Sequence, residues 1–121
     1  MDTQTHITLS PETVAALGLT IPTKFTTQME NAILNLPCVP GFQMFPEPYK
    51  KSTDDMTGFP VGSLLMRYDG QLFVVALLFV KGNRWYDLVS VTKSGYESYK
   101  DYPSRHWVHE NYLLVGQKVT A

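Results

Sequence analysis

The sequence predicts an α+β fold, with two N-terminal helices packed on a five-stranded, strongly bent antiparallel sheet or SH3-like small barrel. Three observations lead to this prediction. Apolar residues recur at helical spacing in residues 1–36, whereas residues 61–121 alternate apolar runs with short turn signals. The intervening residues 37–60 hold most of the prolines and are expected to form a connector. The chain of 121 residues is the size of a single domain, 1–121.

Composition indicates a folded protein and excludes some partners. Hydrophobic residues make up 44% of the chain and charged residues 17%, which is typical of globular domains. The net charge of -1 gives no overall field that would attract nucleic acid or an anionic membrane. The single Cys38 cannot form an internal disulfide, and the first residues lack the basic start and apolar run of a secretory signal. We therefore expect a cytoplasmic protein.

Both predicted helices have recognisable start signals. Ser10 can cap a helix whose first position is Pro11, and Gly18 ends it. The second helix is expected after a cap at Thr23. Its apolar stripe recurs at helical spacing in Phe25, Met29, Ile33 and Leu36.

From residue 61 the pattern is strand, turn, strand. Asp69-Gly70, Gly82-Asn83 and Ser94-Gly95 are read as two-residue hairpin turns. Folding about the first two turns predicts the pairs Met66 with Phe73, Leu64 with Val75, Phe79 with Tyr86, and Leu77 with Leu88.

Residues 72–80, LFVVALLFV, are apolar throughout. This run is about half as long as a membrane-spanning helix needs, so it predicts a strand and not a span. Because both of its faces are apolar, each face must be covered. The N-terminal helices are the expected cover, and a second copy of the chain is the alternative.

The last part of the chain completes the predicted sheet. The segment DYPSRHWVHEN favours a single helical or 3₁₀ turn, and NYLLVG favours a fifth strand. Five short strands with a turn before the fifth resemble SH3-like small barrels in layout. The acidic and aromatic segment of true SH3 domains is absent, so their specificity for proline-rich peptides is not expected.

His106 and His109 raise the question of a metal site, because residues three apart on a helix share a face. The order H-W-V-H-E differs from the zincin motif, and no third ligand has a suitable spacing. Cys38, in LPCVPG, has no base beside it and is expected to be buried. The sequence therefore predicts no metal, no cofactor, no catalytic residue and no enzymatic activity.

Aromatic residues and cations are interleaved in the C-terminal part of the chain. Tyrosine, tryptophan and arginine are the residue types that dominate protein interfaces. The expected partner-binding residues are Trp85, Tyr96, Tyr99, Tyr102, Arg105 and Trp107.

This pattern leads to a functional hypothesis with two alternatives. The hypothesis is a non-enzymatic protein-binding domain that also forms a homodimer, such as a small bacterial or phage inhibitor or accessory factor. The first alternative is a nucleic-acid-binding small barrel, because such proteins stack bases on aromatic rings beside positive charge. The second is a small enzyme of unknown reaction. A membrane partner is not expected.

Overall fold

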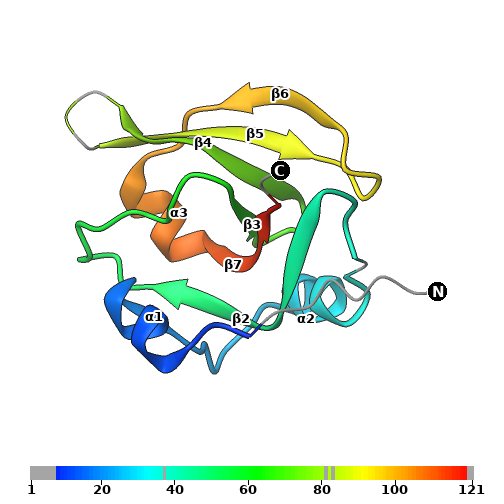
Figure 1. The fold of residues 1–121 in the computed structure, drawn as a ribbon, viewed down its shortest axis with the longest axis horizontal. Coiled ribbons are helices and arrows are strands. Elements are labelled where there is room, and N and C mark those ends of the chain that lie inside the picture. Colours follow the sequence, from blue (N-terminus) through cyan, green and yellow to red (C-terminus); the bar gives the residue numbers. More distant parts are fainter. Residues whose placement is uncertain (1–7, 37, 81, 83, 120–121) are drawn as a thin grey trace.

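The computed structural model describes residues 8–36, 38–80, 82 and 84–119, without the side chains of residues 78–80. One antiparallel sheet has the strand order β1-β2-β7-β3-β4-β5-β6. Its strands are β1 (Leu19–Thr20), β2 (Phe42–Lys51), β3 (Ser63–Arg67), β4 (Leu72–Val80), β5 (Trp85–Val91), β6 (Glu97–Asp101) and β7 (Tyr112–Lys118). The helices are α1 (Pro11–Ala16), α2 (Thr27–Leu34) and α3 (Arg105–Asn111). Figure 1 shows α3 between β2 and the layer formed by β4, β5 and β6.

The predicted architecture of two helices on a five-stranded sheet or small barrel is wrong. The described chain forms one open seven-stranded sheet with three helices. The five predicted strands do form, as β3 to β7. The error lies in residues 37–60, which were read as a connector but contain the ten-residue strand β2, paired with β7.

Two prolines explain why β2 does not look like a strand in the sequence. Proline lacks the N–H that a regular ladder uses, so it is normally confined to edges and bulges. Pro46 and Pro48 lie where the β2–β7 register shifts, between Met44↔Gly116 and Tyr49↔Leu114. The irregularity lets both prolines sit within β2 without breaking its pairing on either side.

The hairpin between β3 and β4 is shifted by one residue from the predicted register. Met66 pairs with Leu72 and not with Phe73, because the connection is a loop of residues 68–70 and not a two-residue turn. Gly70 has φ of 90°, the left-handed conformation that such loops require. A shift of one residue reverses the faces of a strand, so Leu64 and Met66 lie on the face opposite Phe73.

The register of the β4–β5 hairpin also differs from the prediction, but its strands keep the predicted side chains on each face of the sheet. Near its tip, Val80 pairs with Trp85, in agreement with the predicted register. Two irregularities then bring Leu88 opposite Val75 in place of Leu77. Because this shift amounts to two residues, Tyr86 and Leu88 remain on their predicted face. The predicted contact of Phe79 involves a side chain outside the described residues.

The sheet has an apolar core on each face, as the sequence predicted, and β4 contributes residues 72–75 to these cores, whereas Leu77 is exposed. The first core contains Leu19, Phe45, Tyr49, Phe59, Leu65, Phe73, Val75, Tyr86, Leu88, Val108, Tyr112 and Leu114. The second core contains Met29, Val39, Phe42, Met44, Leu64, Met66, Leu72, Val74, Val89, Val91, Leu113 and Val115.

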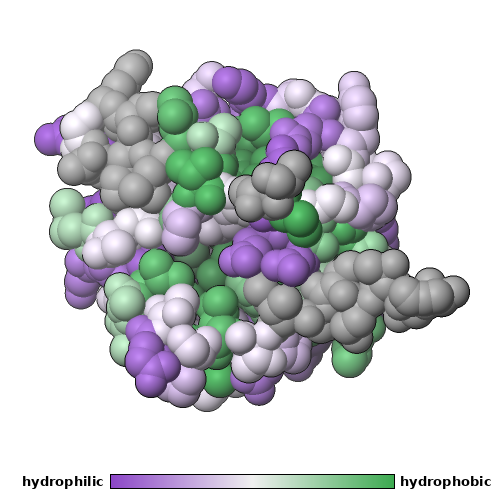
Figure 2. Space-filling model, in the orientation of Figure 1, coloured by the Kyte–Doolittle hydropathy of each residue, from purple (hydrophilic) through white to green (hydrophobic). Residues whose placement is uncertain are grey.

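The two N-terminal helices cover opposite faces of the sheet. Val14 and Leu17, in and just after α1, pack on the first core, and Ala32 and Ile33 of α2 pack on the second. Ser10 caps α1 by accepting a hydrogen bond from Thr13 N, which confirms the first predicted start. The second predicted cap was wrong, because α2 begins three residues later, after Thr26. On the face shown in Figure 2, apolar residues form several small groups among hydrophilic ones.

The described helices are all short, and none has the length and apolar character needed to cross a membrane. The longest apolar run forms strand β4, which confirms the prediction of a strand for residues 72–80.

Candidate functional site

Helix α3 is only two turns long and has a buried inner face and an exposed outer face. Ser104 caps it by accepting a hydrogen bond from Trp107 N at 3.2 Å. Val108 and His109 are buried, whereas His106, Trp107 and Glu110 are exposed. The helix contacts β2, β5 and β7, so its inner face lies against the first core.

His109 is held by hydrogen bonds on both ring nitrogens. The Tyr86 hydroxyl lies 2.6 Å from Nε2, and the Ser52 carbonyl lies 3.2 Å from Nδ1. Because the Ser52 carbonyl can only accept, Nδ1 carries the proton and donates it to Ser52. In the neutral ring Nε2 is then an acceptor, so the Tyr86 hydroxyl donates to Nε2 while it accepts from Phe59 N.

Burial keeps this network neutral. It lowers the pKa of His109 to about 4 and raises the pKa of the Tyr86 hydroxyl above its ordinary value. The nearby charges of Lys51 and Arg105 also favour the neutral imidazole and so lower the pKa of His109. His109 thus joins α3 to β5 and to the segment after β2 as an uncharged structural group.

The two histidines considered as metal ligands do not share a site. Both nitrogens of His109 are occupied, and exposed His106 lies 3.6 Å from Glu110. No group of three histidine, cysteine or acidic residues gathers around a possible metal position in the described chain. The prediction that Cys38 is buried was wrong, because this residue is exposed.

Arg105, expected on the partner-binding surface, is directed inward. Its Nη1 donates to the carbonyls of Asp55 at 2.9 Å and Thr53 at 3.3 Å, and its Nε is buried without an acceptor. Asp55 in turn accepts from Lys51, which is buried and also donates to Leu17 O. Arg105 therefore ties the start of α3 to the segment that follows β2.

Three exposed aromatic side chains gather beside the outer face of α3. The rings of Trp107 and Tyr68 meet edge to face at a centroid distance of 6.2 Å. Tyr99 of β6 accepts a hydrogen bond from Gln71, whose side chain accepts one from Arg67. We call Tyr68, Tyr99 and Trp107, with Arg67 and Gln71 between them, the aromatic surface. Its three rings are 39%, 54% and 44% exposed, respectively.

The other expected contact residues are exposed but lie elsewhere. Tyr96 belongs to the turn between β5 and β6, and Tyr102 follows β6. Trp85 begins β5 and forms a bridge with Ser104. The structure thus groups Tyr99 and Trp107 and leaves the remaining expected residues outside the aromatic surface.

Tyr68 was missed as a surface residue because of the β3–β4 register. Side chains alternate along a strand, so the predicted register places Tyr68 on the same face as Leu64 and Met66 and thus in the expected core. In the structure it belongs to the loop of residues 68–70, and its ring is exposed. The sequence signal that could have identified it is its position directly before Asp69-Gly70, where a longer loop would expose it.

The cations near the aromatic surface already have partners. Arg67 forms a two-pronged ion pair with Asp69, at 3.0 and 2.8 Å. Lys100 of β6 lies 3.6 Å from Asp87 of β5, and Lys118 of β7 lies 2.5 Å from Glu97 of β6. The surface is therefore aromatic without an excess of free positive charge.

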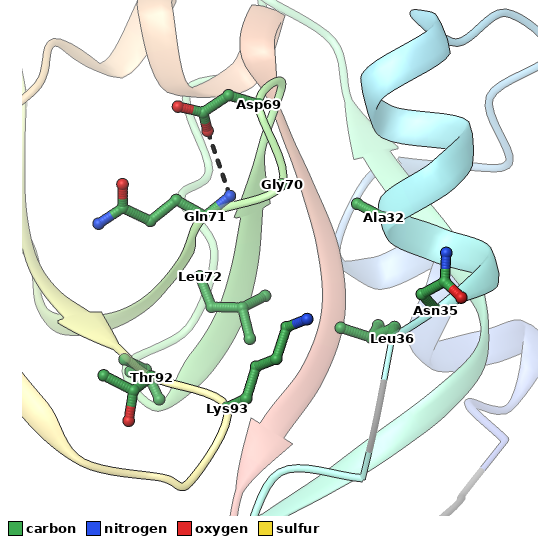
Figure 3. A pocket seen from close by; sticks show the side chains of 10 residues that line it. Ala32, Asn35, Leu36, Asp69, Gly70, Gln71, Leu72, Thr92 and Lys93 are labelled. Carbon is green, nitrogen blue, oxygen red and sulfur yellow. Dashed lines mark hydrogen bonds between the residues drawn. The ribbon is translucent and has the colours of Figure 1, made fainter.

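A separate groove of about 500 Å³ lies between α2 and two turns of the sheet. Figure 3 shows α2 on one side and the chain around Thr92 and Lys93 on the other. The hairpin loop of residues 68–70 lies against α2, where Thr26 donates to Tyr68 O at 3.4 Å. The groove is lined by Ala32, Asn35, Leu36, Asp69, Gly70, Gln71, Leu72, Val91, Thr92 and Lys93.

Comparison with known proteins finds no family model, no curated protein and no solved structure that matches this chain. What the protein does must therefore be inferred from its own geometry.

Proposed function

We propose that the chain is a non-enzymatic protein-binding domain whose contact surface is the aromatic surface. The observation that carries this proposal is the exposed Tyr68–Trp107 pair, with Tyr99 joined to the same hairpin through Gln71. Large rings of this kind anchor protein interfaces because desolvating them in a partner's pocket releases much free energy.

The three aromatic side chains belong to elements that are held in place by hydrogen bonds within the chain. His109 and Arg105 hold α3 by hydrogen bonds to β5 and to the segment after β2. Arg67 fixes the hairpin through Asp69 and Gln71. A surface that is ordered before binding loses less conformational entropy when a partner docks, which supports a binding role.

The charge arrangement favours a protein over a nucleic acid as the partner. Nucleic-acid affinity depends largely on cations that neutralise phosphates. Arg67, Lys100, Lys118 and Arg105 are bonded to carboxylates or carbonyls of the chain itself. Stacking on Tyr68, Tyr99 and Trp107 would then lack most of the electrostatic contribution.

An enzymatic role has less support. His109 has the strongly perturbed pKa that often marks an active site, but its ring is fully buried and both nitrogens are occupied. A substrate could reach it only if α3 moved away from the first core.

The predicted homodimer has a plausible route in β6. This strand is the last in the sheet order and pairs only with β5, which leaves its outer edge open. An open edge can pair with a strand of a second copy. The two sheet faces are less suitable for self-association, because α1 and α2 already pack on them.

Affinity capture with matched variants tests the proposed function. Wild-type protein, the double variant Tyr99→Ala with Trp107→Ala, and the control Tyr96→Ala would be immobilised and exposed to the same native lysate. We expect one or a few proteins to be retained by wild type and control but lost from the double variant. Retention of nuclease-sensitive material, or equal capture by all three proteins, would contradict the proposal.

A further inference from the structure

Most polar side chains that line the groove already form hydrogen bonds with neighbouring groups outside the lining. Asn35 Nδ2 donates to Asn31 O at 2.8 Å, and Thr92 Oγ1 lies 2.9 Å from Ser94 Oγ. The Gln71 amide is held by Arg67 on one side and by Tyr99 on the other. A ligand in the groove would therefore find few unused hydrogen-bonding groups on its walls.

The carboxylate of Asp69 is also neutralised within the chain. It accepts from Arg67 through both oxygens and from Gln71 N at 3.2 Å. The hydrogen bonds from Arg67 are the main reason that the pKa of Asp69 lies below its usual value. Asp69 therefore does not determine the charge of the groove.

Lys93 is the exception among the polar groups. Figure 3 shows its ammonium group projecting into the groove, between Leu72 and Leu36. Within the described residues, no group accepts a hydrogen bond or forms an ion pair with it. The groove thus combines the ammonium group of an exposed lysine with four aliphatic side chains, those of Ala32, Leu36, Leu72 and Val91.

We propose that the groove binds a small amphipathic carboxylate, with a linear aliphatic body lying over Leu36, Leu72 and Val91 and its carboxylate on Lys93. A volume of about 500 Å³ lies within the range of known small-ligand sites. The aliphatic body buries apolar surface without needing hydrogen bonds, and the carboxylate can form a charge-assisted hydrogen bond with the ammonium group.

A free small molecule fits better than a peptide's carboxyl end. A peptide would bring backbone N–H and C=O groups into the groove, where the walls offer few unused partners. Burying such groups unpaired costs free energy. An alkyl chain has no such groups. The groove borders the aromatic surface at Gln71, but this inference does not depend on the proposed function.

Titration of ¹⁵N-labelled protein with sodium octanoate tests the inference. We expect saturable amide shifts confined to residues 31–36, 69–72 and 91–93. The variant Lys93→Met keeps most of the aliphatic stem but removes the charge, and it should weaken octanoate binding by about tenfold. Lys24→Met, which removes an exposed cation outside the groove, should bind octanoate as wild type does.

Three further probes test whether binding depends on the negative charge of the ligand and whether a peptide end can replace the alkyl chain. Octylammonium and octanol should bind more weakly than octanoate, because neither can form an ion pair with Lys93. N-acetyl-alanyl-leucine, which carries a free carboxylate at a peptide end, should also bind more weakly. Equal binding of octylammonium or octanol, unchanged binding in Lys93→Met, absence of saturation, or tighter binding of the peptide would each overturn the inference.

Discussion

The inner and outer faces of α3 differ in chemistry although they belong to the same seven residues. On the inner face, His109 is buried, neutral and hydrogen bonded through both nitrogens. On the outer face, three residues earlier, His106 is exposed and lies 3.6 Å from Glu110. Two identical residues at helical spacing thus have unrelated roles. The inner face fixes the helix, and the outer face, with Trp107, is free to contact a partner.

The largest effect is expected on the inner face, for His109→Ala. This substitution removes a buried ring together with the acceptor of the Tyr86 hydroxyl proton and the donor to the Ser52 carbonyl. We expect the free energy of unfolding to fall by about 3–5 kcal/mol, as measured by urea denaturation. A loss no larger than that of His106→Ala would show that the inner network does not anchor α3.

The next largest effect is a pH dependence of the free energy of unfolding that arises from His109. Its pKa is about 4 in the folded chain and about 6.5 when unfolded, so the unfolded state binds the proton first as the pH falls. The stabilising contribution is complete above pH 6.5 and is lost between pH 6.5 and 4, by up to about 3 kcal/mol.

The matched control for this pH dependence is His109→Gln. It stays neutral over the whole range, whereas the carboxylates titrate in both proteins. We expect the stability difference between wild type and variant to shrink as the pH falls through this window. A difference that stays constant from pH 7 to pH 4 would mean that His109 is not buried in its neutral form.

A smaller effect on stability, with a large effect on binding, is expected for Trp107→Ala. The ring is exposed and its main described contact is the edge-to-face pair with Tyr68. The free energy of unfolding should fall by about 1 kcal/mol or less, while partner capture should be lost. If the variant unfolded as readily as His109→Ala, the outer face would also have a structural role.

The smallest effect is expected for His106→Ala. Exposed ion pairs such as His106–Glu110 contribute no more than about 0.5 kcal/mol. Thermal unfolding followed by circular dichroism should therefore show a melting temperature close to that of wild type. A marked loss of stability would indicate that the exposed side of α3 is held by contacts other than those described.

The sequence was informative at several local signals. Ser10 and Pro11 start α1 as expected, and apolar runs separated by turn signals located β3 to β7. The local signal for a cap at Thr23 was misleading, because α2 is capped by Thr26.

The sequence failed where a long-range interaction decides the outcome. Pro46 and Pro48 disfavour a strand locally, yet pairing with β7 makes β2 part of the sheet. The choice between a two-residue and a three-residue loop at Asp69-Gly70 also depends on the pairing of β3 with its neighbours.

The candidate site shows the same contrast between local signals and long-range contacts. Tyr99 and Trp107 were identified from their residue type, because exposed aromatics favour interfaces. Tyr68 was missed through the one-residue error in register. The inward direction of Arg105 and the bond between Tyr86 and His109 could not be predicted, because their partners are far apart in the sequence.

Site-specific photocrosslinking tests the central claim most directly. A photoreactive phenylalanine analogue would replace Trp107 on the outer face of α3, with the same replacement at Tyr96 as the control. The proteins would be irradiated in native lysate. We predict a discrete protein adduct at position 107, which disappears when Tyr99→Ala is added, and no such adduct at position 96. Absence of an adduct at position 107, an adduct that persists with Tyr99→Ala, or an adduct with nucleic acid would contradict the claim that this face is a protein-binding surface.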